Sequence, residues 1–310
     1  MKTNKELIVL DVGCRYGIFP LFKNLKKKLN FLMVDVDAVE IERLKKKYDG
    51  YNNIKFFQAF LGSTNGPVNI NITEHKGYIS SKAINKDSFW FSKLRPDEDA
   101  VSEVKTIQSV KSSEWIKKEA PSIDILKLDI EGGELDFLIA MEDQIASPTA
   151  IVAECFLDRP YQGNSNFSTI SEYLFTKGYQ LVGAEMENAA INEFHTPQDR
   201  IPICMTCIFL NKKINTPKDR QEGLQYLQTL FALKLQGLFF DYLLSHIHTL
   251  SKDECVLFED MKFSIGHVLY KKQREIGHGY DWANNLYKQI FGEPFPRASD
   301  FNEHEFFNPA

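Results

Sequence analysis

The sequence lacks the features that mark several large classes of protein. Its 37 lysines and arginines are outnumbered by 42 aspartates and glutamates, and the net charge of -5 argues against a nucleic-acid partner. No uncharged apolar run reaches the roughly 18 residues that a membrane-spanning helix needs, so we expect no membrane span. Residues 1–6 lead into an apolar segment too short for an export signal, which predicts a cytoplasmic protein.

Cysteine is scarce, and the five cysteines are scattered along the chain. An odd number of cysteines is typical of reduced thiols in a cytoplasm rather than of a disulfide framework. Cys204 and Cys207 have the spacing of half a zinc site, but no second pair of cysteines or histidines completes it. They lie in an apolar segment with the pattern of a strand, so we predict two small core residues and no metal site.

Short apolar runs alternate with amphipathic segments through the first 155 residues, which is typical of a parallel α/β domain. Between the runs at 7–10 and 31–34, apolar residues recur every three or four positions and predict a helix at 18–29. A second predicted helix separates the latter run from a third at 54–60. This order predicts a right-handed, parallel strand–helix–strand–helix–strand unit. Further strands are predicted at 68–73, 123–129, 150–156, 179–182 and 203–210.

The pattern changes after a polar segment at residues 211–217. Beyond it, apolar residues recur at helical spacing for most of the remaining chain. We therefore expect an α/β domain at residues 1–212 and an α-helical region at 213–310, which is a candidate surface for homo-oligomerisation or for binding a partner. Within the first domain, the polar and irregular residues 75–100 predict a surface loop or lid.

Acidic residues lie at the ends of four predicted strands. The six residues are Asp11, Asp35, Asp37, Asp129, Glu131 and Glu154. Because the carboxyl ends of parallel strands meet at the edge of the sheet where ligands bind, we expect these side chains to surround a ligand. A cluster of carboxylates is costly unless a cation or a catalytic task accompanies it, so the cluster favours a cationic ligand.

The turn after the first strand contains Gly13 and Gly17 and excludes two common nucleotide sites. A P-loop needs Gly-Lys-Ser/Thr, a dinucleotide site needs three glycines, and this turn has neither. The acidic edge would also repel a pyrophosphate, whereas it suits S-adenosylmethionine, which carries a sulfonium, an ammonium and ribose hydroxyls. The glycines permit close approach of the backbone, and Asp35, with Asp37 as a second candidate, would accept hydrogen bonds from the ribose.

The segment at residues 125–138 resembles the signature of the FkbM-type methyltransferases. It reads ILKLDIEGGELDFL, similar to the family's order of lysine, apolar residue, aspartate, apolar residue, glutamate, glycine, small residue and glutamate. The resemblance continues at 152–156, 161–167 and 170–182 and covers about two thirds of the chain. It implies a class I Rossmann-like methyltransferase fold, with a mostly parallel seven-stranded sheet and here an α-helical C-terminal extension. It also implies methyl transfer from S-adenosylmethionine, usually to oxygen.

The resemblance also implies roles for residues of the cofactor site. Asp11, Gly13 and Gly17 would line the methionine part, Asp35 would hold the ribose, and Ala59 and Phe60 would border the adenine. Arg15 and Tyr16 replace the family's commoner asparagine-rich turn. They resemble a branch associated with glycan assembly, so we expect the acceptor to be a sugar, a glycan or another small hydroxylated metabolite.

Methyl transfer to a hydroxyl requires a base that is positioned near the methyl group. Asp129 and Glu131, at the end of the fourth strand, are the candidate bases, and crowding with Glu154 would raise the pKa of at least one of them. Alternatively, Glu131 only starts the following helix. Lys127 is expected to balance these acids.

Two histidines in irregular segments, His75 and His195, are further candidates for the base. Candidate contacts with the acceptor are Glu154, His75 and Tyr161. Two other functions stay open at this point: a non-catalytic binding protein that has kept the fold, and a nicotinamide-dependent oxidoreductase. The intact acids and glycines argue against the first, and the glycine spacing and acidic edge argue against the second.

Overall fold

The structure is a computed structural model that describes residues 6–74, 77–95, 101–163, 165–189, 201–212, 220–246, 266, 269, 280–291 and 294–295. The chain divides into two compact units, residues 1–235 and 236–310. The second unit contains α6 (Gln236–His246) and α9 (Tyr280–Phe291), so the expected helical C-terminal extension is present. The functional division at residues 212 and 213 stays a prediction. Within the described ranges, no helix is both long and apolar enough to cross a bilayer.

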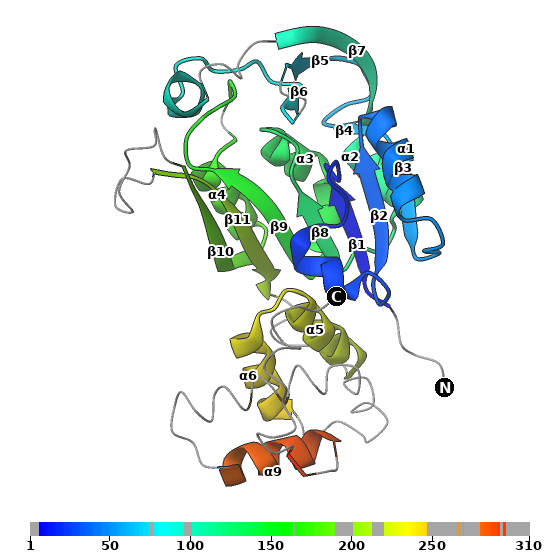
Figure 1. Cartoon of the computed structure of the whole chain (residues 1–310), viewed down its shortest axis with the longest axis vertical. Coiled ribbons are helices and arrows are strands. Elements are labelled where there is room, and N and C mark those ends of the chain that lie inside the picture. Colours follow the sequence, from blue (N-terminus) through cyan, green and yellow to red (C-terminus); the bar gives the residue numbers. More distant parts are fainter. Residues whose placement is uncertain are drawn as a thin grey trace. The chain divides into compact units, whose positions relative to one another are not determined.

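A seven-stranded sheet forms the centre of the first unit (Figure 1). Its strands are β1 (Ile8–Val12), β2 (Asn30–Asp35), β3 (Ile54–Gln58), β8 (Ile125–Leu128), β9 (Ala150–Phe156), β10 (Tyr179–Ala189) and β11 (Ile201–Asn211). The spatial order is β10-β11-β9-β8-β1-β2-β3, and only β11 and β10 introduce antiparallel pairings. The predicted mostly parallel seven-stranded sheet is confirmed. The order reverses between β1 and β8, which is where such sheets bind ligands.

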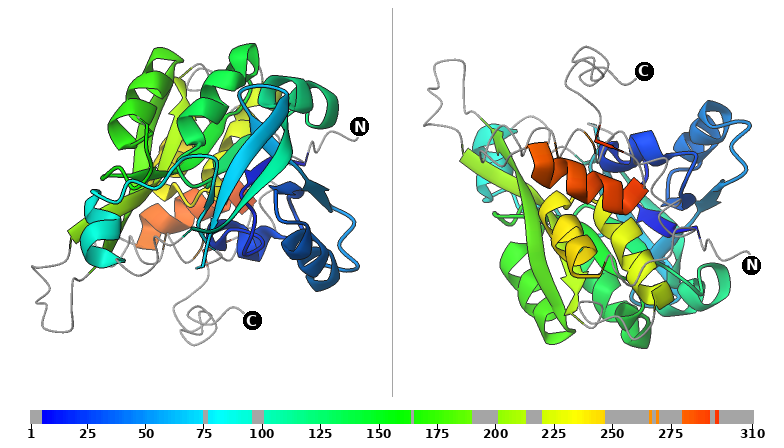
Figure 2. Two further views of the ribbon diagram at one scale, coloured as in Figure 1. Left: turned by 90° about the horizontal axis from the view of Figure 1, so that it is seen from above. Right: turned by 90° about the horizontal axis from the view of Figure 1, so that it is seen from below.

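Helices lie on both faces of this sheet. One face is covered by α2 (Ser112–Glu119), α3 (Glu134–Ala140) and α4 (Phe167–Thr176), and α3 contacts both α2 and α4. On the opposite face, α1 (Ala38–Lys47) packs on β2 and β3, as the view from above in Figure 2 shows. The helix α5 (Arg220–Ala232) belongs to the first unit and contacts η1 (Pro20–Leu25).

The helix predicted at 18–29 is wrong in its extent, because only the short 3₁₀ helix η1 forms there. Phe22 is the one buried residue of η1, but Ile18 and Leu29 on either side of it are buried as well, so the periodic spacing marks buried positions without a continuous helix. The side-chain amide of Asn53 donates hydrogen bonds to the carbonyls of Lys26 and Leu29, at 2.7 and 2.6 Å. These carbonyls are therefore satisfied without a further helical turn.

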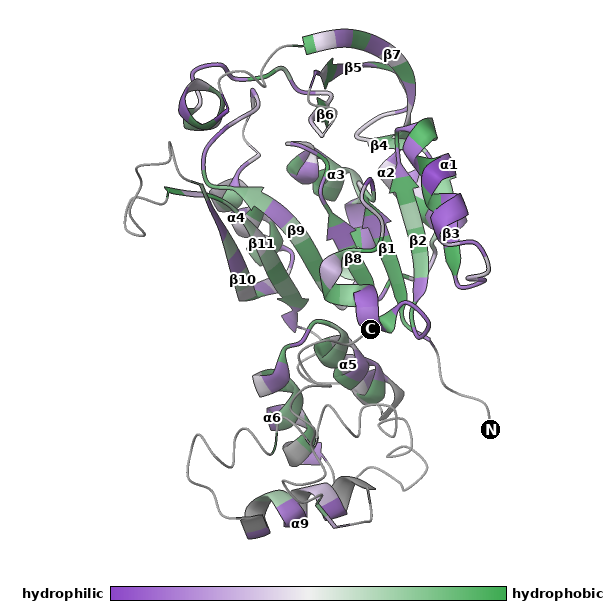
Figure 3. Cartoon of the chain, viewed as in Figure 1, coloured by the Kyte–Doolittle hydropathy of each residue, from purple (hydrophilic) through white to green (hydrophobic). Residues whose placement is uncertain are grey.

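The strands at the centre of the sheet are buried on both faces, as their continuous apolar runs predicted. These apolar runs appear mostly green in Figure 3. Every residue of β8 is buried, including the charged Lys127, which is 5% exposed. A buried lysine is rare unless it is paired, so this residue points to a compensating negative charge at the end of the strand.

A second sheet contains four strands in the order β4-β7-β5-β6. These are β4 (Phe60–Gly62), β5 (Gly66–Thr73), β6 (Ile79–Ser80) and β7 (Val101–Lys111), drawn above the central sheet in Figure 1. The strand β5 confirms the apolar alternation at 68–73. The sequence did not predict β7, because its exposed residues leave no apolar face to detect.

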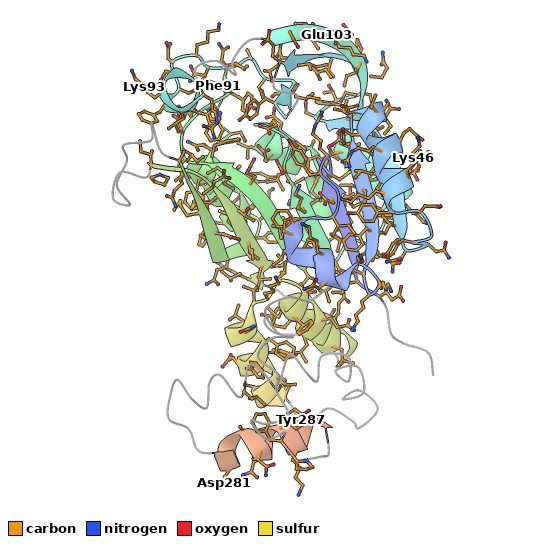
Figure 4. All side chains as sticks on the ribbon, viewed as in Figure 1. Lys46, Phe91, Lys93, Glu103, Asp281 and Tyr287 are labelled. Atoms are coloured by element: carbon orange, nitrogen blue, oxygen red, sulfur yellow. The ribbon has the colours of Figure 1, made fainter. Side chains whose placement is uncertain are left out.

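The described part of the predicted surface loop at 75–100 is more ordered than expected. It contains β6 and a helical turn, η2 (Trp90–Leu94), in which Trp90, Phe91 and Leu94 are buried. Phe91 and Lys93 of this turn are labelled in Figure 4. The turn packs against Phe156 and Tyr161, so the apolar cluster joins η2 to the end of β9.

Candidate active site

The turn after β1 is built around two glycines, Gly13 and Gly17, whose φ angles are 84° and 95°. A Cβ atom at Gly13 would lie 1.7 Å from the carbonyl oxygen of Asp129, so the turn packs directly against the end of β8. The amides of Gly13 and Cys14 both donate to the carbonyl of Val34, at 2.9 and 3.2 Å. This turn therefore contacts the ends of both strands that neighbour β1.

The two aspartates after β2 have different partners. Asp37 caps α1, because its Oδ1 accepts hydrogen bonds from the amides of Val39 and Glu40, and its Oδ2 lies 3.3 Å from Arg15 Nη1. Asp35 accepts one hydrogen bond, from the amide of Asp37 to Oδ1 at 2.9 Å, and burial raises its pKa. Both oxygens of the Asp37 carboxylate thus have partners within the protein. Asp35 is the aspartate that lines the cleft described next.

A cleft with about 1160 Å³ of empty space, open to solvent, lies between the strand ends and the second sheet. From the side of β1, β2 and β3 it is lined by Gly13, Arg15, Tyr16, Asp35, Ala59 and Phe60. From the side of β8 and α3 it is lined by Asp129, Glu131, Asp136 and Phe137. The second sheet and its loops contribute Pro67, Val68, Gly77, Ile79, Ser81 and Ser109.

The structure thus brings together about half of the site residues that the sequence predicted. Gly13, Asp35, Ala59, Phe60, Asp129 and Glu131 all line the cleft. The lining does not include Asp11, Gly17, Asp37, Glu154 or Tyr161. His75 and His195 lie outside the described residues.

Lys127 connects the buried acids behind the cleft. Its Nζ atom lies 3.2 Å from both Asp11 Oδ1 and Asp129 Oδ2 and donates to the carbonyl of Gly13, also at 3.2 Å. Burial alone would lower the pKa of Lys127, but the two carboxylates outweigh it and the pKa is raised. Burial raises the pKa of Asp11 to about 6, although Lys127 opposes this. The expected balancing of the acids by Lys127 is confirmed.

Three carboxyl groups gather at the ends of β8 and β9. One oxygen from each of Asp129, Glu131 and Glu154 lies within 4.8 Å of the other two. Three negative charges at this spacing cannot all persist, so the cluster retains protons at neutral pH. Burial, followed by the charge of Asp129, raises the pKa of Glu131 to about 8 and that of Glu154 well above its usual range. The pKa of Glu131 is thus raised as expected, but by burial and the charge of Asp129 rather than by the expected crowding with Glu154.

Glu131 is held from both sides by residues of other elements. The hydroxyl of Ser80 donates to its backbone carbonyl, and the hydroxyl of Tyr161 donates to its Oε2, each at 2.6 Å. Its neighbour Glu134 serves the turn instead: Oε1 accepts a hydrogen bond from the amide of Ile130 at 2.9 Å, and burial raises its pKa to about 7. The role of starting the following helix, which was the alternative for Glu131, therefore belongs to Glu134, whereas Glu131 lines the cleft.

Some features of the site had no clear signal in the sequence. Lys82 forms an ion pair with Asp136 at the cleft, and Tyr16 is 74% exposed at its lining. Ser80 and Ser81 lie in a segment without a periodic pattern, so periodicity alone does not place them beside the cleft. Cys204 and Cys207 are both buried, as predicted, although the thiol of Cys204 donates to Glu187 at 3.4 Å.

Three solved structures with a similar chain path are methyltransferases. The methyltransferase FkbM from Methylobacillus flagellatus KT is 15% identical, with a TM-score of 0.39; the match covers 66% of this chain but only 43% of that protein. Magnesium protoporphyrin IX methyltransferase from Synechocystis PCC 6803, with bound S-adenosylmethionine, is 12% identical, with a TM-score of 0.37 and coverages of 66% and 70%. An N-methyltransferase from Bradyrhizobium japonicum WM9 is 10% identical, with a TM-score of 0.36 and coverages of 66% and 85%.

The sequence itself gives a stronger result than these distant structures. Among curated proteins none matches the chain. The sequence does match the family described as the methyltransferase FkbM domain, over residues 11–181 and therefore over more than half of its length. This match includes the end of β1 and all of β2, β8 and β9, the strands whose ends carry the acids at the cleft. The chain therefore belongs to the FkbM family of methyltransferases, which has the class I α/β fold and uses S-adenosylmethionine as methyl donor.

Proposed function

We propose that the protein transfers a methyl group from S-adenosylmethionine to a hydroxyl of a sugar, a glycan or another small hydroxylated metabolite. One observation carries this proposal: four of the residues expected to hold the cofactor line a single cleft together with both candidate bases, Asp129 and Glu131. The four are Gly13, Asp35, Ala59 and Phe60. An in-line displacement requires the methyl group and the acceptor oxygen to meet at close range, so both sets must share one space.

The residues of the cleft fit the cofactor. Asp35 Oδ2 has no hydrogen-bond partner among the described residues, which leaves it available to ribose hydroxyls. Ala59 and Phe60 offer an apolar wall for a purine. Arg15 is the one cation among the described residues that line the cleft, and its pairing with Asp37 leaves no good partner for a pyrophosphate. The acidic lining instead favours the positive charges of a sulfonium and an ammonium.

The bound cofactor would supply an electrophilic methyl group on a positively charged sulfur. Glu131, whose pKa is raised to about 8, would in its ionised form accept the proton of the acceptor hydroxyl as the hydroxyl oxygen bonds to the methyl carbon and the bond between that carbon and sulfur breaks. Asp129 is held near Lys127, so it would accept a hydrogen bond from the acceptor and orient it rather than take its proton.

The charge of the cleft also narrows the acceptor. Asp129, and Glu131 when it is ionised, would repel a phosphate or carboxylate close to the reacting hydroxyl. A neutral polyol avoids this repulsion and can donate hydrogen bonds to the same groups. The exposed ring of Tyr16 adds an aromatic surface on which a sugar face can pack.

Calorimetry with S-adenosylhomocysteine and NAD tests the cofactor. We expect the wild-type protein to bind S-adenosylhomocysteine and not NAD, and Asp35→Ala to weaken that binding about tenfold or more, which is about 1.4 kcal/mol. Asp49→Ala, at an exposed position after α1, is the matched control and should bind as the wild type does. Binding of NAD alone would overturn the proposal.

Mass spectrometry then tests the reaction. Incubation with S-adenosylmethionine and a panel of monosaccharides and oligosaccharides should give a product heavier by one methylene group, and Glu131→Gln should form it far more slowly. Cofactor binding without a methylated product from any hydroxylated acceptor would contradict catalysis and support a binding role.

A further inference from the structure

We propose that Tyr161 is a positioning residue for Glu131. Together with Ser80 it holds the carboxyl group and the backbone of Glu131 so that Oε1 can take the proton of the acceptor hydroxyl. This inference depends on the proposed function in its assignment of Glu131 as the base. Tyr161 does not line the cleft, so it acts through Glu131 and not on the acceptor.

The backbone of Glu131 has an unfavourable conformation that needs support. Its φ angle is 54°, in the left-handed region that residues with a Cβ atom rarely adopt, and Gly132 follows with a φ of 87°. Such a conformation is unfavourable for glutamate and persists where surrounding contacts enforce it. The 2.6 Å hydrogen bond from Ser80, a residue of β6 in the second sheet, fixes the carbonyl of this strained residue.

Tyr161 is placed to fix the side chain as well. Its hydroxyl donates to Glu131 Oε2 at 2.6 Å, and its ring lies against the turn itself. A Cβ atom at Gly132 would come within 2.7 Å of Tyr161 Cδ2, so only glycine lets the ring approach this closely. One tyrosine thus contacts both the backbone of the turn and the carboxyl group that the turn presents.

The position of Tyr161 is in turn set by rigid neighbours. Its ring packs edge-on against Phe91 of η2 and Phe156 of β9, with centroids 6.2 and 5.9 Å away. Its backbone pairs with Ile84, and the amide of Gln162 donates to the carbonyl of Ala83 at 2.7 Å. Aromatic packing and backbone pairing together leave the hydroxyl little freedom, which a positioning residue requires.

The hydrogen bond also has an electrostatic effect. Burial and the charge of Asp129 raise the pKa of Glu131, whereas the hydrogen bond from Tyr161 lowers it. The titratable groups that face Glu131 are Asp129 on its own turn, Lys127 on β8, Glu134 on α3, Glu154 on β9 and Tyr161. Lys82, beside β6, forms an ion pair with Asp136 instead. Among these, Tyr161 is the one that donates a hydrogen bond to the Glu131 carboxylate within the described chain.

Carbon-13 NMR of glutamate-labelled protein tests the inference, with the Glu131 signal assigned from Glu131→Gln. We expect Glu131 to titrate near pH 8 in the wild type and about one unit or more higher in Tyr161→Phe, because the ionised form loses a donor. Tyr173→Phe is the matched control, since its hydroxyl donates to the carbonyl of Leu138 and not to Glu131. An unchanged or lowered value in Tyr161→Phe overturns the inference.

A second variant addresses the case in which Tyr161→Phe fails to fold. A fluorinated tyrosine introduced at position 161 alone keeps the ring and has a more acidic hydroxyl, which donates more strongly. It should lower the apparent pKa of Glu131, and a rise or no change overturns the inference.

Kinetics separate positioning from packing. With an acceptor from the mass-spectrometric screen, Tyr161→Phe should lower kcat about tenfold or more near pH 7 while the affinity for S-adenosylhomocysteine stays at the wild-type value. An unchanged kcat overturns the inference. Failure of the wild-type protein to bind S-adenosylhomocysteine would instead contradict the proposed function, so the two failures are distinguishable.

Discussion

Gly13 shows how one residue sets the geometry of the cleft, and a pair of glycines can test it. Gly13 and Gly50 have nearly equal φ angles of 84° and 85°, but a Cβ atom at Gly13 meets the carbonyl of Asp129 and one at Gly50 meets nothing within 4 Å. Gly50→Ala should therefore lower the free energy of unfolding by about 1–2 kcal/mol, which is the conformational cost alone. Gly13→Ala should cost clearly more and abolish binding of S-adenosylhomocysteine. Denaturant unfolding and calorimetry check both, and equal losses in the two variants would refute the steric role.

At the same scale, the residues explain what the sequence could and could not predict about the site. The position of Asp35 and Asp37 after an apolar strand predicted two acids at the ligand edge. The sequence could not predict that Asp37 caps α1 while Asp35 lines the cleft. This difference depends on which carboxylate accepts hydrogen bonds from the first amides of α1 and on an ion pair with Arg15 from another turn. The contact between Tyr161 and Glu131 joins residues 30 positions apart and has no local signal.

The helix α4 allows a prediction at the scale of an element. Asn166 caps it: the side chain accepts a hydrogen bond from the amide of Thr169, whose hydroxyl accepts one from the amide of Asn166. Asn166→Ala should lower the free energy of unfolding by about 1 kcal/mol, and Asn166→Ser should largely retain it, since serine caps comparably. Denaturant unfolding measures the difference. Equal losses in the two variants would show that the cap contributes nothing specific.

Elements were predictable where burial follows a regular period. The strands β1, β2, β8 and β9 are buried on both faces and gave continuous apolar runs. The predicted helix at 18–29 failed although its apolar residues Ile18, Phe22 and Leu29 are buried. A periodic pattern does not reveal that the side-chain amide of Asn53 satisfies backbone carbonyls at the end of this segment. The sequence did not predict the helical turn η2, because its aromatic residues pack with Phe156 and Tyr161, which are distant in sequence.

For the whole molecule, the buried acids give stability a particular dependence on pH. The folded chain raises the pKa of Asp11 from 3.8 to about 6, and those of Glu134 and Glu131 from 4.5 to about 7 and about 8. Between about pH 4 and 8 the folded state therefore holds protons that the unfolded state has released. The stabilisation is fully present below the unfolded pKa values and is lost as the pH rises through the folded ones.

The midpoint temperature of thermal unfolding should therefore decrease by about 5 °C or more as the pH is raised from 5.5 to 8.5. Each kcal/mol of stability corresponds to about 2–4 °C in a domain of this size. Glu134→Gln keeps the acceptor for the amide of Ile130 but cannot ionise, so it should flatten this decline. Glu172→Gln, at an exposed position on α4, should leave the slope unchanged. Scanning calorimetry across this pH range measures these midpoints. A wild-type midpoint that rises with pH would mean that the buried carboxyl groups are ionised in the folded protein. In that case the cluster of protonated carboxyl groups around the proposed base would not exist.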